Sequence, residues 1–154
     1  MMRNLIAGLM AALVLAVMPA QARGGAGVSG TEVMAVLEAM ELAPQLREDS
    51  YGDPLVAFEL EGLNVYMNFY DCGDGRCGSL QLQVGLDLEH GTSLQVANVY
   101  NTRYRYGRVS LDDEMDPYLR YDFEVVDTEP SAHIRSQVER SGELLGSFTS
   151  AVGF

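Results

Sequence analysis

The sequence predicts an α+β fold in which helices cover one face of an antiparallel sheet. Two neighbouring segments, 63–70 and 79–86, alternate strictly between apolar and polar residues, as strands that bury only one face do. Three other segments carry apolar residues at helical spacing, and runs of strands separate them. The predicted order is a helix, four strands of which the first is short, a helix, two strands and a final helix.

The first predicted helix has clear signals at both ends. Ser29 and Glu32 fit a capping box, in which each side chain accepts a backbone N–H at the start of the helix. Apolar residues follow at helical spacing until Pro44 ends the helix.

Turn signals divide the next part of the chain into strands. Glu61 and Gly62 are suited to the two-residue turn of a hairpin, and a longer turn covers residues 49–54. A glycine-rich turn lies between the two cysteines in segment 71–77. The strands that these turns delimit are 45–48, 55–60, 63–70 and 79–86.

The second half of the domain is predicted in the same way. A capping box of Thr92 with Gln95 begins a helix that Gly107 closes. The buried side of this helix is predicted to hold Leu94, Ala97, Asn101 and Tyr104. Two strands and a last helix follow, at 109–111, 119–125 and from Pro130 onward.

An export signal precedes the domain. Arg3 supplies a positive charge, residues 5–18 are almost entirely apolar, and residues 20–22 form an Ala-x-Ala cleavage motif. We therefore expect cleavage between Ala22 and Arg23 and a periplasmic or secreted mature protein without stable membrane insertion. The alternative is an uncleaved N-terminal anchor.

This interpretation divides the chain into three parts. Residues 1–22 are the signal peptide, residues 23–28 are a mobile Gly/Ala-rich lead-in, and residues 29–154 are a single domain.

The charge of the chain narrows the classes of partner. Ten basic residues against 22 acidic ones give a formal net charge of −12 at pH 7. A surface this acidic repels nucleic acid and anionic lipid, so neither is an expected partner. Cationic partners, metal ions or simple solubility remain open.

Cys72 and Cys77 are the only cysteines, and the predicted hairpin places them at opposed strand ends. In an exported protein such a pair is expected to form a structural disulfide. A reactive or metal-binding pair is the alternative, although the spacing is not that of a Cys-x-x-Cys redox motif.

Two further groups of residues are candidate sites. The acidic turn Asp112, Asp113, Glu114 and Asp116 could offer hard oxygen ligands to calcium or serve a carboxylate-based hydrolase. Its spacing is not that of a calcium-binding loop, however, and a solvated acidic turn is much the commoner explanation. Basic and aromatic residues alternate in one segment, as in many binding surfaces, namely Arg103, Tyr104, Arg105, Tyr106 and Arg108. Alternatively, Tyr104 packs in the core and these arginines pair with carboxylates of the same chain.

Tyr66 and Tyr70 share one face of the 63–70 strand, which is either a recognition surface or a face covered by the last helix. No arrangement of residues typical of catalysis, and no phosphate-binding glycine loop, is recognisable, so neither an enzyme nor a cofactor is predicted.

Several blocks of the sequence resemble the YbjN-domain family, whose members are labelled bacterial sensory transduction regulators. These blocks are Gly52-Asp53-Pro54, Glu61 to Tyr66, Phe69 to Cys72, Asn98 to Asn101, and Arg103 to Arg108. The resemblance runs from about Ser29 to Phe148. It implies a fold like that of type III secretion chaperones, with helices on one side of a curved antiparallel sheet. No catalytic residues are established for this family.

The resemblance also implies a function. We expect an exported, non-enzymatic interaction or regulatory module that binds a protein or peptide partner in the periplasm. A homodimer is compatible with this expectation.

Overall fold

The computed structural model describes residues 26–154. The predicted signal peptide, its cleavage site after Ala22 and the start of the lead-in lie outside the described residues. The helices are α1 (Gly30–Glu38), α2 (Leu94–Arg103) and α3 (Pro130–Val152). The strands are β1 (Gln45–Glu48), β2 (Pro54–Leu60), β3 (Leu63–Gly73), β4 (Arg76–Gly85), β5 (Gly107–Leu111) and β6 (Pro117–Glu124).

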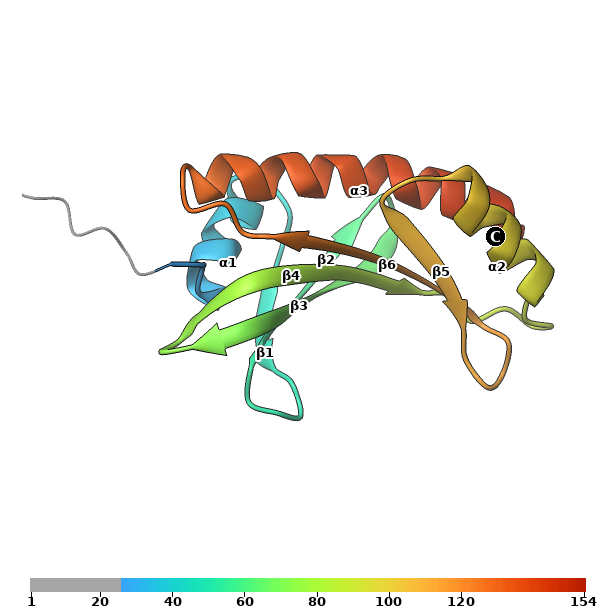
Figure 1. The fold of residues 1–154 in the computed structure, drawn as a ribbon, viewed down its shortest axis with the longest axis horizontal. Coiled ribbons are helices and arrows are strands. Elements are labelled where there is room, and N and C mark those ends of the chain that lie inside the picture. Colours follow the sequence, from blue (N-terminus) through green and yellow to red (C-terminus); the bar gives the residue numbers. More distant parts are fainter. Residues whose placement is uncertain (1–25) are drawn as a thin grey trace, which may run out of the picture.

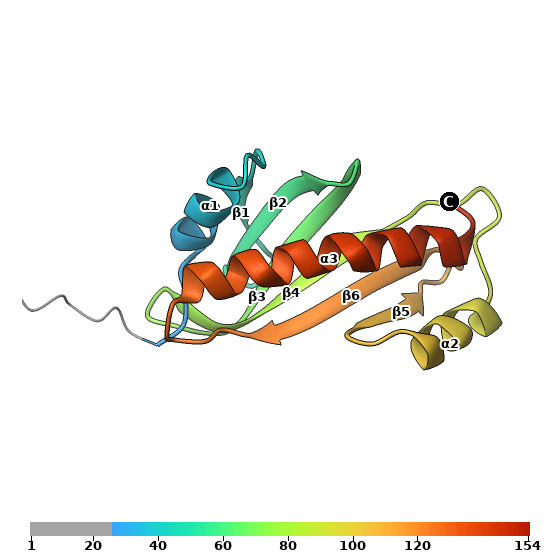
Figure 2. The ribbon, with the colours of Figure 1, turned by 90° about the horizontal axis from the view of Figure 1, so that it is seen from above.

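These elements form two layers, a curved sheet and a layer of helices on one of its faces (Figure 1). The six strands lie in the order β1-β2-β3-β4-β6-β5, and every neighbouring pair is antiparallel. The long helix α3 runs the length of the sheet, with α1 near its first turns and α2 near its last (Figure 2). The predicted fold class and element order are therefore confirmed.

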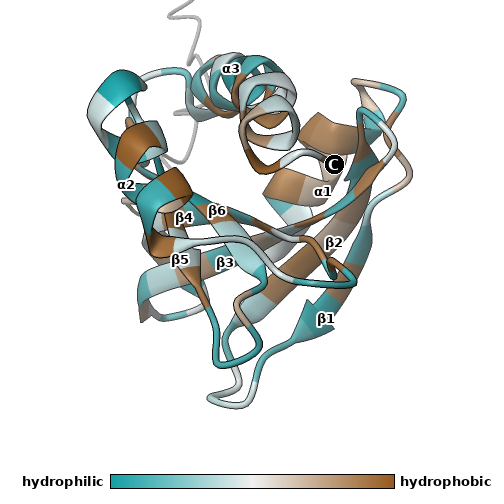
Figure 3. Cartoon of the chain, turned by 90° about the vertical axis from the view of Figure 1, so that its right-hand side faces the viewer, coloured by the Kyte–Doolittle hydropathy of each residue, from teal (hydrophilic) through white to brown (hydrophobic). Residues whose placement is uncertain are grey.

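The hydrophobic core lies between the two layers, which Figure 3 shows end-on. From the helix side it receives Ile134, Val138 and Phe148 of α3, which are fully buried. From the sheet it receives alternate residues of the central strands, namely Val65, Met67, Phe69, Leu80, Leu82 and Val84. The strict alternation of apolar and polar residues in β3 and β4 therefore arises because only one face of the sheet is buried.

The first helix begins as predicted but ends earlier. The Ser29 N–H donates to Glu32 Oε2 at 2.7 Å, and the Glu32 N–H donates to Ser29 Oγ at 3.3 Å, which is the capping box. The helix ends at Glu38 rather than at Pro44, because the following turn places Glu41 in the left-handed region (φ 62°).

The second helix begins one residue later than predicted. Ser93 is the N-cap, with Oγ accepting the Val96 N–H at 3.2 Å, because the Thr92 N–H is already donated to the Met115 carbonyl at 2.8 Å. Leu94, predicted to be buried, is therefore 71% exposed. Ala97 and Tyr100 form the buried side of α2 and belong to the hydrophobic core.

Gly107 begins β5 instead of closing α2. A Cβ at this position would lie 2.8 Å from Leu119 Cδ1, so a larger residue would have to displace the Leu119 side chain and glycine is favoured.

The sheet face opposite the helices, here called the open face, is polar. One row of side chains crosses all six strands on it: Gln45, Ala57, Tyr66, Gln83, Arg120 and Arg108. Tyr70 lies on the same face as Tyr66, so α3 does not cover these two tyrosines. The β1–β2 and β5–β6 turns project from the sheet on the side away from α3 (Figures 1 and 3).

The lead-in was expected to be mobile, but its last residues are part of the fold. Val28 is buried and forms an isolated antiparallel bridge with Cys77. Gly27 is also buried, and its N–H donates to Asp127 Oδ1 at 3.0 Å. A glycine-rich composition predicted flexibility here, whereas the glycine actually permits a close approach to Cys77.

Of the helices within residues 26–154, none combines the length and the apolar character that a membrane crossing requires.

Candidate functional site

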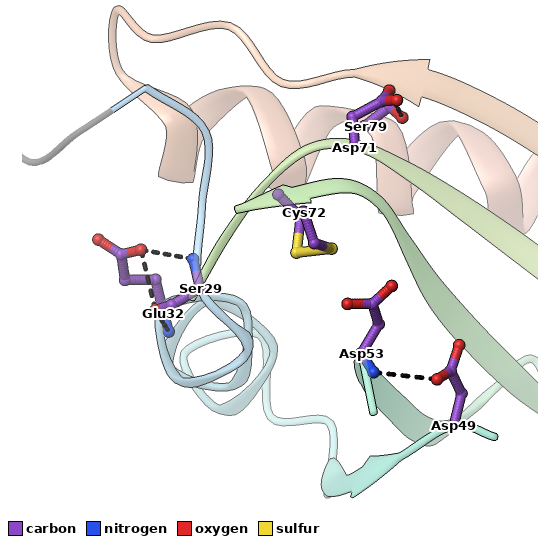
Figure 4. The surroundings of a disulfide bond; sticks show 8 residues. Ser29, Glu32, Asp49, Asp53, Asp71, Cys72 and Ser79 are labelled. Carbon is purple, nitrogen blue, oxygen red and sulfur yellow. Dashed lines mark hydrogen bonds between the residues drawn. A yellow bond between two sulfur atoms is a disulfide. The ribbon is translucent and has the colours of Figure 1, made fainter. Parts of the chain in front are cut away.

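The two cysteines lie at disulfide distance at the end of the β3–β4 hairpin, as predicted. Their sulfur atoms are bonded, and Cys72 and Cys77 are cross-strand partners with Cα atoms 4.0 Å apart. Figure 4 shows this hairpin end beside Ser29 and Glu32 at the start of α1. The bond links the two strands at the end of the hairpin, and both residues pack with the core.

The acidic turn between β5 and β6 uses its carboxylates to organise its own backbone. Asp112 Oδ1 accepts the N–H groups of Glu114 and Asp116, at 3.0 and 2.9 Å. Asp116 is buried, and its Oδ1 accepts the Leu88 N–H at 2.9 Å. Asp113, like Asp112 and Glu114, is exposed.

This arrangement explains the acidic turn without a metal ion. Within residues 26–154, no three His, Cys, Asp or Glu side chains converge in a way that could hold one. No observation of the described chain therefore favours the calcium or hydrolase hypothesis.

The arginine–tyrosine segment does not form one continuous surface. Arg108 lies on the open face and pairs with Asp122 at 2.5 Å. Tyr106 is exposed and lies beneath the guanidinium of Arg140 in α3, with Cζ 4.7 Å from the ring centroid. Only Arg103 and Tyr104, at the end of α2, belong to the hollow described next.

A hollow of about 330 Å³ separates α2 from the last turns of α3. Its lining is largely apolar, with one guanidinium at the rim, and consists of Gln95, Val96, Val99, Tyr100, Arg103, Tyr104, Ser150 and Ala151. Val99 is 51% exposed although it is apolar. We call this hollow, together with the exposed Arg105 that follows Tyr104 in the chain, the α2 surface.

Arg103 of the α2 surface contacts an aromatic ring and, among the described residues, no carboxylate. Arg103 stacks on Tyr104, with Cζ 5.6 Å from the ring centroid, and Tyr104 in turn packs on Tyr100 at 4.6 Å between centroids. Within residues 26–154, neither Arg103 nor Arg105 has a carboxylate within ion-pair distance. Part of the role of Arg103 is structural, since a cation in the last turn of a helix complements its dipole.

The shifted pKa values do not indicate an acid–base pair. Burial raises the pKa of Tyr100 and also that of Tyr121, where Arg140 opposes the rise. The N–H of Ser29 lowers the pKa of Glu32, with Arg76 adding to this effect. Each shift accompanies a packing or capping role that the fold already explains.

The tyrosines of the open face are separate from the α2 surface. Tyr66 lines a second hollow of about 260 Å³, whose other polar walls are Gln45, Arg47, Glu59 and Asn64. Ala57 forms part of it because its side chain is small beside Tyr66, its partner in β3. Tyr70 is exposed farther along the same strand and is not among the lining residues.

Sequence reasoning missed one feature of the α2 surface and one of the neighbouring contact between α2 and β5. Val96, Val99 and Ala151 could not be assigned to one hollow, because α2 and α3 are distant in the sequence. Asn101 was assigned to the buried stripe, but its side-chain amide instead pairs with the backbone of Val109, accepting its N–H at 2.7 Å and donating to its carbonyl at 3.0 Å. It thereby covers the free edge of β5.

Comparison with known proteins gives a structural and a family match. The type III secretion chaperone SycH of Yersinia pestis, solved in complex with a stable fragment of YscM2, is similar at a TM-score of 0.46 and 12% identity, over 75% of this chain and 98% of the matched chain. A likeness at this level says nothing about what this chain binds. No curated protein matches the chain.

The family model YbjN, described as "Putative bacterial sensory transduction regulator", matches residues 29–154. This range covers all three helices and all six strands. The chain therefore belongs to the YbjN family.

Proposed function

We propose that this YbjN protein is an exported, non-enzymatic module that binds a protein or peptide partner in the periplasm through the α2 surface. The observation that carries the proposal is the coincidence of an apolar hollow with arginines that have no acidic partner in the described chain. Export rests on the Ala-x-Ala motif and the apolar run before it.

The chemistry of the α2 surface defines the partner segment that fits it. An apolar side chain of the partner would enter the hollow and cover Val99 and the ring of Tyr104. A carboxylate next to that side chain would pair with Arg103, which Tyr104 already orients. The partner segment is therefore apolar and acidic.

The acidic charge of the rest of the molecule would also orient the partner. A chain with a net charge of −12 repels an acidic partner everywhere except near exposed cations. Charge complementarity would thus guide the partner to the α2 surface and affect the association rate more than the final affinity. Association should accordingly slow as the salt concentration rises.

Site-specific photo-crosslinking in cells that export the full chain tests the proposal. A photoreactive residue at Val99 should give discrete adducts in the periplasm, and these should be lost in the Arg103→Ala/Arg105→Ala double variant. Position 51, where Tyr51 is 90% exposed on the β1–β2 turn, is the control and should not give the same adducts.

A second control separates local charge from overall charge. Arg47→Ala removes a cation from the open face and should leave the Val99 adducts unchanged. Unfolding of the double variant would assign the two arginines a structural role. Unchanged adducts in a folded double variant would exclude the α2 surface and make the Tyr66/Tyr70 face the next one to test.

A further inference from the structure

The end of the β3–β4 hairpin, residues 72–77, is only weakly supported by the rest of the sheet. Asp71 has a φ of 55°, which interrupts the extended conformation of β3 just before this end. Beyond Asp71 only two residue pairs form, Cys72 with Cys77 and Gly73 with Arg76. A hairpin of this size is marginal in water by itself. The disulfide therefore adds a covalent restraint to the backbone of Cys77, whose side chain is buried and whose neighbour Gly78 accepts the Val125 N–H at 2.8 Å.

The N-terminal segment, residues 27–28, uses that backbone as its docking partner. The Val28 N–H donates to the Cys77 carbonyl at 3.0 Å, and the Cys77 N–H donates to the Val28 carbonyl at 2.8 Å. The pairing of β6 with β4 ends at Glu124 opposite Ser79. Val28 thus takes the position beside β4 that β6 has left.

The Arg76 side chain of the hairpin end also binds the N-terminal segment. Arg76 donates from Nη2 to the Gly27 carbonyl at 2.6 Å, and its Nη1 lies 3.1 Å from Glu32 Oε2 at the start of α1. Gly27 itself must remain glycine, because its φ is 83° and an added Cβ would lie 2.4 Å from the Cys77 carbonyl oxygen.

We propose that the Cys72–Cys77 disulfide is a redox-responsive lock on the N-terminal segment, so that reduction by a dithiol releases residues 27–28 while the domain stays folded. This role is separate from partner binding at the α2 surface, which lies at the other end of α3 (Figure 2). The consequence is a free strand position beside β4 and a free N-terminal segment in the reduced protein.

The accessible sulfur defines the order of the exchange. Cys77 is 1% exposed, whereas Cys72 is half-buried, so a thiolate of the dithiol attacks Cys72 Sγ. The S–S bond breaks, Cys77 leaves as a thiolate and takes up a proton, and Cys72 is held in a mixed disulfide. The second thiol of the reductant then displaces Cys72, which leaves two protein thiols and an oxidised reductant.

Amide hydrogen exchange of the exported protein, with and without dithiothreitol, tests the lock. The amides of Val28 and Cys77 should exchange roughly thirtyfold faster after reduction, as expected when a short disulfide loop is opened. Amides of β2 and of the central part of β3 should keep their protection. The Cys72→Ser/Cys77→Ser variant should match the reduced protein and should not respond to dithiothreitol.

A matched pair of glycine variants tests the docking itself. Gly27→Ala should expose the Val28 amide in the oxidised protein, whereas Gly52→Ala should not, although Gly52 has a similar φ of 86° and no atom within 4 Å of an added Cβ. Equal protection of Val28 in the oxidised and reduced protein would overturn the proposal. Loss of protection throughout the sheet on reduction would also overturn it, since the disulfide would then support the whole fold.

Discussion

At one end of α3, Arg76 is held by the Gly27 carbonyl and the Glu32 carboxylate, whereas at the other end Arg103 and Arg105 have no carboxylate within ion-pair distance among residues 26–154. The first end is tied by a disulfide, a capping box and a two-way backbone bridge. The second end contains a hollow of about 330 Å³ beside exposed apolar side chains. Arg76 therefore helps to hold the first end together, and we call this the closed end. The second end, where Arg103 and Arg105 are exposed beside the hollow, is called the open end.

This difference shows that composition does not determine the role of a charged residue. The chain has 22 acidic residues, so carboxylates are numerous enough for every arginine to form an ion pair. Arg76 does so because the disulfide hairpin brings it to the first turn of α1. Arg103 does not; it lines the hollow between α2 and α3 and stacks on Tyr104. Arg103 and Arg105, which are exposed and have no carboxylate partner within residues 26–154, therefore remain available to a partner.

The largest expected effect concerns the core that both ends share. Phe148 of α3 is fully buried and packs edge-on against Tyr100 at 6.3 Å between centroids. Phe148→Ala should lower the free energy of unfolding by about 3–5 kcal/mol in urea denaturation, because it leaves a cavity. Phe154→Ala, at a position 63% exposed, is the control and should change it by less than about 0.5 kcal/mol. Equal losses would contradict the assigned core.

The next effect concerns the closed end alone. Cys72→Ser/Cys77→Ser should lower the free energy of unfolding by up to about 2 kcal/mol, the value for a short disulfide loop, without preventing folding. Thermal unfolding under non-reducing conditions measures it, and thiol titration of the wild-type protein is the companion measurement. Two free thiols in the exported wild-type protein would contradict a disulfide at this end.

A smaller effect is expected at the open end, where Asn101 covers the edge of β5. Asn101→Ala leaves the N–H and carbonyl of Val109 without this partner and should cost about 1–2 kcal/mol in urea denaturation. Asn98→Ala lies one turn earlier on the exposed side of α2 and serves as the matched control. If the two variants are equally stable, water replaces the amide without loss.

The smallest effect is a pH dependence at the closed end. Hydrogen bonds from Ser29, with a contribution from Arg76, lower the pKa of Glu32 from its ordinary value of 4.5. A carboxylate with a lowered folded-state pKa stabilises the fold above pH 4.5, and this stabilisation is lost as the pH falls through the folded-state value. Glu32→Gln should therefore be less stable than wild type at pH 6 and approach it at about pH 3.

The control for this measurement is Glu38→Gln, an exposed acidic position in the same helix. It should follow the wild-type stability at both pH values. A constant difference between wild type and Glu32→Gln across the range would show that the charge of Glu32 is not involved.

The sequence by itself determined the fold class, the element order and the cysteine pair. These features depend on neighbours along the chain: the period of two in β3 and β4, the capping box of Ser29 with Glu32, and two cysteines on either side of a glycine-rich turn. Local sterics and hydrogen bonding specify each of them, so a short window of sequence is enough to predict them.

Tertiary structure alone decided the cap of α2, the docking of Val28 and the composition of the hollow. Thr92 lost the N-cap position because its N–H reaches Met115, and Val28 is ordered because β6 leaves a free place beside β4. The hollow joins side chains of α2 and α3 that are about fifty residues apart in the chain. Each of these depends on contacts between distant segments, whose energies exceed local preferences and leave no periodic signal in the sequence.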